Sequence, residues 1–253
     1  MAPEQLIQLS LRLQLTHLSI TDHDSTDGYI KARTFLSDAS PLKLIPGIEI
    51  NTQGGSSAHI LGYGIDVYNE ELQNSLTNFR IYRRERLLKM TEKIQSLGFP
   101  LTFDDVLAAA PNANSLGRPH IADALKAKKI VRNRKEAFDR FLQKGKPAYI
   151  ESEVPTLKHA LDLITKAGGI TVLAHPSYYM SENLLTEMKT LGLRGVEIFY
   201  PEHTKSLIQR YRDLAKSLGL YVTGGSDFHG PGTSRDRLAC VNVPEEALEM
   251  FHF

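Results

Sequence analysis

Residues 18–26 read Leu-Ser-Ile-Thr-Asp-His-Asp-Ser-Thr, so a short apolar run passes directly into three side chains that can bind metal. The apolar part predicts a short buried strand, which places the Asp-His-Asp cluster at the carboxyl end of that strand. In a parallel α/β barrel the functional groups gather at this end of the strands, where the loops leave. The stretch therefore predicts an α/β fold whose site is built from strand ends.

Strands and helices alternate on both sides of this stretch. Helices are expected over residues 4–15, 28–38, 157–167, 182–191 and 204–218. Strands are expected over residues 43–45, which lead into a polar-tipped segment at residues 47–50, and over residues 59–63, 170–174, 195–200 and 221–223. Strand, helix and strand in this order are typical of parallel βαβ units. We therefore expect one α/β barrel.

The alternation stops between residues 69 and 144, where the pattern is helical throughout. Gly98-Phe99-Pro100 is expected to end a first long helix, and three shorter helices follow. Basic residues between Arg80 and Lys93 on the long helix favour a solvated helix face over a nucleic-acid patch. We expect a barrel formed by residues 1–68 and 145–253, with a helical insertion over residues 69–144.

The composition is that of an ordinary globular protein. Of the 253 residues 42% are hydrophobic and 23% charged, which excludes wholesale disorder. The 30 basic and 29 acidic residues leave a net charge of +1, so we expect a small substrate and no stable complex with long nucleic acid. No apolar run approaches the ~20 residues that span a bilayer, so no membrane partner is expected. Cys240 has no second cysteine to pair with, which favours the cytoplasm.

Most of the expected strands carry a metal-ligand side chain at or near one end. These side chains are Asp22, His23, Asp24, Glu49, His59, His175, His203, Asp227 and His229. Histidine and carboxylate ligands without cysteine suit Zn²⁺, Mn²⁺ or Fe²⁺. More than four candidate ligands indicate two or more ions that share carboxylate bridges, an arrangement typical of phosphoester hydrolysis.

Five motifs of the chain resemble successive signatures of the PHP (polymerase and histidinol phosphatase) family. They are Ile20-Thr21-Asp22-His23-Asp24-Ser25-Thr26, Gly47-Ile48-Glu49, Ala58-His59-Ile60-Leu61-Gly62-Tyr63, Ala174-His175-Pro176 and Gly225-Ser226-Asp227-Phe228-His229-Gly230. The resemblance implies a distorted (β/α)7 barrel that binds two to three divalent ions, Mn²⁺ first and Fe²⁺ or Zn²⁺ as alternatives. It also implies a set of six metal ligands with Glu49 as a bridge, namely His23, Glu49, His59, His175, Asp227 and His229.

The chain departs from this family in one respect. PHP chains begin with a strand that carries a His-x-His pair and then an aspartate, and this sequence contains no His-x-His pair. We therefore expect a PHP-type barrel that lacks its first strand and exposes a sheet edge at that position. A start codon assigned too late and a natural truncation both remain open as explanations.

The insertion carries a segment that is expected to bind substrate. Gly117-Arg118-Pro119-His120-Ile121-Ala122 resembles the PHP branch that includes nucleoside 3',5'-bisphosphate phosphatases and short-RNA 5'-exonucleases. Pro119 suits the first turn of a helix, where exposed N–H groups and the Arg118 guanidinium both suit phosphate oxygens. We therefore expect Arg118 and His120 to contact the substrate. Arg235 and Arg237 could also reach a phosphate, and ordinary surface roles for them are equally open.

Three further side chains are candidates for supporting roles at the site. Asp22 could orient His23 by accepting its second ring proton, and Asp24 could shuttle a proton. His203 could protonate the leaving group, with a loop histidine as the alternative.

Together these features predict a metal-dependent phosphoesterase. We expect a metal-activated hydroxide to hydrolyse a phosphomonoester of a nucleoside 3',5'-bisphosphate or the 5' end of a short RNA. The alternatives are a histidinol-phosphate phosphatase, which the helical insertion disfavours, and a non-catalytic relic that binds metal or nucleotide. The metal, the exact substrate and the oligomeric state stay open.

Overall fold

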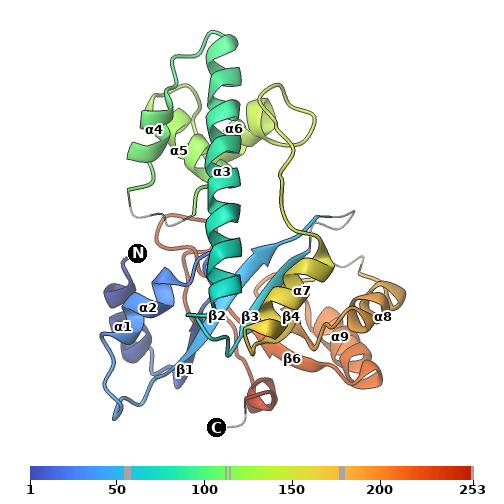
Figure 1. Cartoon of the computed structure of the whole chain (residues 1–253). Coiled ribbons are helices and arrows are strands. Elements are labelled where there is room, and N and C mark those ends of the chain that lie inside the picture. The colour runs from blue at the N-terminus through green and yellow to red at the C-terminus, as the bar shows by residue number, and fades with distance from the viewer. Residues whose placement is uncertain (54–57, 112, 114, 177–179, 252–253) are drawn as a thin grey trace. The chain divides into compact units, whose positions relative to one another are not determined.

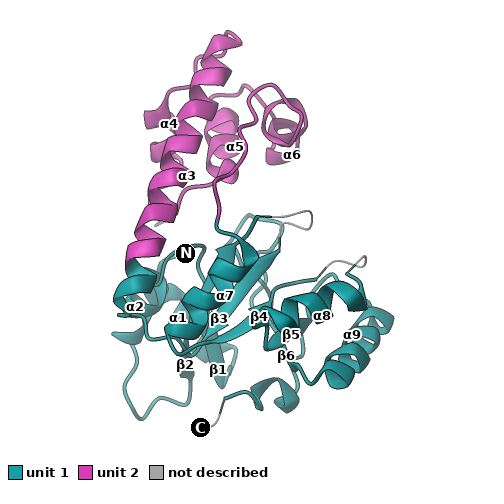
Figure 2. Ribbon diagram, turned by 45° about the vertical axis from the view of Figure 1, so that its right-hand side comes forward, with its two compact units in different colours: residues 1–73, 155–253 teal, residues 74–154 magenta. Residues whose placement is uncertain are grey.

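The protein is described by a computed structural model that covers residues 1–53, 58–111, 113, 115–176 and 180–251. The chain divides into two compact units (Figure 2). Residues 1–73 and 155–253 form the barrel unit, and residues 74–154 form the helical unit. The expected limits of barrel and insertion stay a prediction, and the two units are described separately.

Six strands of the barrel unit form one sheet in the order in which they occur along the chain (Figure 1). They are β1 (His17–Ile20), β2 (Lys43–Asn51), β3 (His59–Tyr63), β4 (Ile170–Leu173), β5 (Gly195–Phe199) and β6 (Tyr221–Gly224). The sheet curls into a half-barrel, so the expected α/β fold is confirmed.

Strand β3 is antiparallel to both β2 and β4, whereas the other neighbouring pairs are parallel. The expectation of parallel βαβ units throughout is therefore wrong at β3. The reason is the connection from β2, because residues 52–58 are fewer than the dozen or more that a parallel crossover needs. The reversal brings the first residue of β3, His59, opposite Asn51 at the end of β2.

Strand β2 is one continuous strand that joins the expected strand at residues 43–45 to the segment at residues 47–50. Its first half pairs with β1 as far as Ile20 opposite Pro46, and its second half pairs with β3 from Gly47 onwards. Pro46 has no N–H to donate, which suits the point where the partner strand changes. A Cβ atom on Gly47 would lie 2.1 Å from Ser19 Oγ, 2.8 Å from Thr21 Cγ2 and 3.2 Å from the Ile20 carbonyl oxygen, so the close approach of the neighbouring chain favours glycine.

The helices of the barrel unit pack on the sheet and on one another. They are α1 (Pro3–Arg12), α2 (Asp27–Arg33), α7 (Leu157–Lys166), α8 (Glu182–Thr190) and α9 (Lys205–Leu218), and a 3₁₀ turn, η2 (Glu245–Leu248), follows β6. Helix α2 packs on β1 and β2, α7 on β3 and β4, and α9 on β5 and β6. Thr156, Ser181 and Thr204 accept backbone N–H groups at the starts of α7, α8 and α9, which explains where these helices begin.

The helical unit has its own hydrophobic core. Most of the long helix α3 (Glu70–Ser96) belongs to it, followed by α4 (Phe103–Ala108), α5 (Arg118–Ala127), α6 (Arg134–Ala137) and a π-helical turn, η1 (Phe138–Leu142). Leu87, Met90 and Ile94 of α3 pack in one buried cluster with Ile121 and Leu125 of α5.

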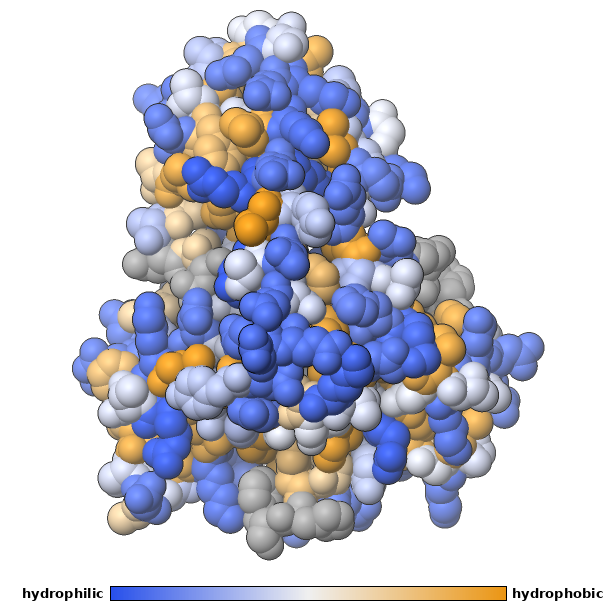
Figure 3. Space-filling model, in the orientation of Figure 1, coloured by the Kyte–Doolittle hydropathy of each residue, from blue (hydrophilic) through white to orange (hydrophobic). Residues whose placement is uncertain are grey.

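In the described part of the chain, no helix has the length and apolarity needed to cross a membrane. Most of the surface visible in Figure 3 is hydrophilic, with hydrophobic residues scattered over it.

Candidate metal centre

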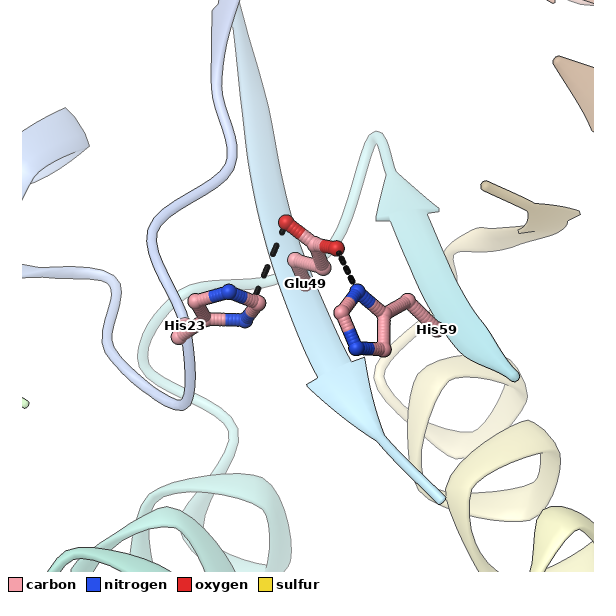
Figure 4. Close-up of side chains that lie close together, drawn as sticks. All are labelled: His23, Glu49 and His59. Carbon is pink, nitrogen blue, oxygen red and sulfur yellow. Dashed lines mark hydrogen bonds and ion pairs between the residues drawn. The ribbon is translucent and has the colours of Figure 1, made fainter. Parts of the chain in front are cut away.

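Glu49 is the centre of the candidate site. It lies on β2 and is only 5% exposed. Its Oε1 lies 2.6 Å from His59 Nδ1, and its Oε2 lies 3.7 Å from His23 Nδ1 (Figure 4). One ligand atom from each of the three side chains lies within 4.8 Å of the others. The three side chains are therefore close enough to share one ion.

Three neighbouring strands bring this cluster together. His23 follows β1 and continues its pairing with β2, because the Asp24 N–H donates to the Glu49 carbonyl (3.0 Å) and the Glu49 N–H donates to the Asp22 carbonyl (3.2 Å). His59 begins β3, and the antiparallel direction of β3 places this histidine at the edge where β1 and β2 end.

His175 adds a third imidazole beside the Glu49 carboxylate. It follows β4, and its Nε2 lies 3.4 Å from Glu49 Oε1. The rings of His59 and His175 meet edge to face with their centroids 5.0 Å apart. The backbone of His175 has a φ of 26°, and its N–H donates to Glu197 Oε2 at 2.9 Å. Glu49 therefore faces three histidines from three different elements.

The charge of Glu49 is stabilised by these neighbours. Burial by itself raises the pKa of the Glu49 carboxyl, but the charge of His23 and the hydrogen bonds of His175 and His59 hold this pKa well below its usual range. Burial likewise lowers the pKa of His175, but the hydrogen bond and charge of Glu49 outweigh it and raise that pKa. An ionised carboxylate among imidazoles is the donor set that Zn²⁺, Mn²⁺ and Fe²⁺ accept, so these residues suit a divalent ion.

Asp227 and His229 form a second group after β6. Asp227 accepts a hydrogen bond from the Tyr200 hydroxyl at 3.1 Å and forms an ion pair with Arg235. His229 Nδ1 lies 2.7 Å from the Asp227 carbonyl oxygen, a contact of the kind that orients metal-binding histidines. The ring of Tyr200 lies 5.4 Å from that of His175, so Tyr200 links this group to the Glu49 cluster.

The candidates for proton transfer occupy two different environments. Asp24 is buried, with a φ of 52°, and follows directly after His23. His203 Nδ1 lies 2.9 Å from the Ile198 carbonyl oxygen, and its Nε2 lies 3.0 Å from the Pro176 carbonyl oxygen. A catalytic role for His203 would require one of these contacts to break. Both assignments stay predictions.

Arg118 and His120 belong to the helical unit, at the start of α5. His120 Nδ1 accepts a hydrogen bond from the Gly117 N–H at 3.0 Å, so its Nε2 carries the ring proton when the imidazole is neutral. The guanidinium carbon of Arg118 lies 5.5 Å from the Phe138 ring centroid and 5.9 Å from that of Tyr149. The guanidinium of Arg86 lies 5.6 Å from the same Tyr149 ring, and its Nε donates to the Ile150 carbonyl at 2.8 Å. Both guanidinium carbons therefore lie within 6 Å of the Tyr149 ring centroid.

Two residues of the site were not predicted from the sequence. Glu197 is buried on β5, and burial raises the pKa of its carboxyl to about 7. Its signal in the sequence is a single acidic residue inside the apolar strand Gly-Val-Glu-Ile-Phe. Tyr200 donates a hydrogen bond to Asp227. A tyrosine that follows a strand does not by itself predict such a contact.

Comparison with known proteins gives relatives that match over most of this chain. No family model matches. A solved structure from Bifidobacterium adolescentis, assigned as a metal-dependent phosphoesterase, is 31% identical with a TM-score of 0.88, and the match covers 98% of this chain and 89% of that one. The 3',5'-nucleoside bisphosphate phosphatase of Chromobacterium violaceum is 29% identical over 238 residues, 92% of this chain and 83% of the relative. A 5'-3' exoribonuclease of Haemophilus influenzae is 29% identical over 237 residues, 91% and 85% of the two chains.

Proposed function

The chain belongs to the PHP family of metal-dependent phosphoesterases, and on that premise we propose that its substrate is a small nucleotide with a terminal phosphate. The proposed substrates are a nucleoside 3',5'-bisphosphate and, as the second candidate, the 5' end of a short RNA. The phosphatase and exoribonuclease names of its relatives support these two classes. The observation that carries the hydrolytic activity is the buried Glu49 carboxylate among three histidines.

Two to three divalent ions are the proposed cofactors, Mn²⁺ first and Fe²⁺ or Zn²⁺ as alternatives. The residues that would hold them are His23, Glu49, His59, His175, Asp227 and His229. A bridging role for Glu49 is supported by its two oxygens, because Oε1 faces His59 and His175 while Oε2 faces His23. When bound, such ions supply an activated water nucleophile and neutralise charge on the phosphoryl group.

Two residues of the chain itself are proposed to transfer a proton and to protonate the leaving group. Asp24 would take up or pass on a proton beside His23, since it is buried next to that ligand in the chain. His203 would protonate the leaving alkoxide after releasing one of its two carbonyl contacts.

Arg118 is proposed to hold a phosphate of the substrate, with His120 beside it at the start of α5. Among the described residues no carboxylate forms an ion pair with Arg118, and its closest polar contact is a 3.4 Å hydrogen bond to the Leu142 carbonyl. A guanidinium that is not paired with a carboxylate can donate two parallel hydrogen bonds to phosphate oxygens. The cytoplasm is the proposed location, because Cys240 is the single cysteine of the sequence.

The test is phosphate release from adenosine 3',5'-bisphosphate, a 5'-phosphorylated short RNA and histidinol phosphate, each with Mn²⁺ and with chelator. We expect Mn²⁺-dependent release from the bisphosphate, weaker release from the RNA and none from histidinol phosphate. Faster release from histidinol phosphate would overturn the proposed substrate class. No release from any substrate would support a non-catalytic binding protein instead.

A further inference from the structure

A second buried carboxylate lies next to the candidate metal centre. Glu197 is 5% exposed, and its neighbours on β5, Val196 and Ile198, are fully buried. Acidic side chains are almost never buried without a partner, because leaving water costs free energy that only hydrogen bonds or opposite charges offset. The hydrogen bond that the structure gives to this carboxylate comes from the main chain of His175, at 2.9 Å.

That backbone N–H belongs to a strained turn. His175 has a φ of 26°, a conformation that L-amino acids with side chains rarely adopt. The preceding residue, Ala174, still donates its N–H to the His59 carbonyl at 3.0 Å, so the chain turns between Ala174 and His175. Pro176 follows and disfavours the ordinary helical conformation for His175. A strained residue persists only where its surroundings hold it in place.

The carboxylate that holds this turn is itself confined. Glu197 lies opposite Thr223 in the pairing of β5 with β6, and the register shifts between Glu197 and Phe199. Irregularities of this kind re-aim side chains near functional sites. A Cβ atom on Gly225 would lie 3.3 Å from Glu197 Oε1, so the glycine leaves the carboxylate just enough room.

We propose that Glu197 is a positioning residue for the metal centre, which accepts the His175 N–H and so holds the turn that aims the His175 imidazole at Glu49. The carboxylate acts on the backbone of a ligand, and its negative charge is not what the turn requires. The proposal rests on the proposed metal site, because it assigns Glu197 a role in holding one of the ligands of that site.

Two conservative substitutions of Glu197 distinguish the effect of its side-chain length from the effect of its charge. Glu197→Gln keeps the length and an acceptor oxygen but removes the charge, whereas Glu197→Asp keeps the charge but is one methylene too short. We expect Glu197→Gln to bind Co²⁺ within about twofold of wild type. We expect Glu197→Asp to bind it roughly 10- to 100-fold more weakly, the usual effect of losing a group that orients a metal ligand.

The experiment titrates the metal-free 253-residue chain with Co²⁺ and follows both the affinity and the visible absorption spectrum. A changed spectrum in Glu197→Asp, with that of Glu197→Gln unchanged, would indicate a displaced nitrogen ligand. Val196→Ala is the matched control, because it weakens the same buried strand without touching the His175 N–H. Equal losses of affinity in Val196→Ala and Glu197→Asp would overturn the proposal, as would an opposite order of the Gln and Asp variants.

A second measurement does not depend on metal. The backbone amide of His175 in the metal-free protein is expected to resonate at low field in wild type and Glu197→Gln, and to move upfield in Glu197→Asp. An amide resonance that is the same in all three proteins would overturn the proposal. If the His175 amide resonance shifts as expected but the wild-type chain binds no Co²⁺, the contact between Glu197 and His175 is supported. The proposed metal site is then overturned instead.

Discussion

Replacing Glu49 by glutamine tests the centre of the proposed site. The variant keeps the shape of the side chain but removes the negative charge that faces His59, His175 and His23 at 2.6, 3.4 and 3.7 Å. One charged interaction of this kind contributes about 1.5–3 kcal/mol, and each 1.4 kcal/mol corresponds to about tenfold in affinity. We therefore expect the dissociation constant for Mn²⁺ to rise roughly ten- to hundredfold or more.

The assay is isothermal titration of the metal-free chain with Mn²⁺ at pH 8, together with the rise in melting temperature that the ion produces. Glu71→Gln is the matched control, since it removes the same charge from an ion pair with Lys166 whose side chains are both more than half exposed. Exposed ion pairs contribute about 0–1 kcal/mol, so this variant is expected to bind Mn²⁺ like wild type.

Acidification gives an independent check on the metal-free protein. The lowered pKa of Glu49 means that the folded state releases this proton more readily than the unfolded chain does. The stabilisation is present above the ordinary pKa of 4.5 and is lost as the pH falls through the lowered value. Wild type is therefore expected to lose more stability than Glu49→Gln between pH 5 and pH 3.

Equal Mn²⁺ affinities of wild type and Glu49→Gln would refute the assignment of Glu49 as a ligand.

Three further predictions concern other parts of the chain. Because the pKa of His175 is raised and a ligand must be neutral, Mn²⁺ affinity is expected to fall already as the pH drops from 8 to 6; a flat profile would contradict this. Arg118→Ala is expected to lower kcat/KM for adenosine 3',5'-bisphosphate roughly ten- to hundredfold with an unchanged melting temperature, whereas Lys126→Ala on the same helix leaves both unchanged. Gly47→Ala is expected to destabilise the barrel unit by about 1–3 kcal/mol in thermal unfolding, because its Cβ would clash with Ser19 Oγ. A melting temperature equal to that of wild type would show that β1 moves aside without cost.

Much of the architecture could be read from local patterns. The apolar run before Asp22-His23-Asp24 predicts the strand that forms, and the helical pattern after residue 69 predicts the helices that the helical unit contains. These predictions are possible because a few neighbouring residues are enough to indicate that a residue lies at the end of a strand. The residues that gather around Glu49 were therefore identifiable before the structure, although their role as ligands stays a prediction.

Other features depend on contacts between distant parts of the chain. The direction of β3 follows from the short connection after β2, and it decides that His59 lies beside Glu49. The contact from Glu197 to His175 joins residues 22 positions apart, and only the register of the sheet brings them together. Strand pairing and buried polar contacts of this kind are set by the packing of the whole sheet, which no short stretch of sequence contains. The sequence by itself thus determined which residues can bind metal, and the tertiary structure decided which of them face one carboxylate and what holds them there.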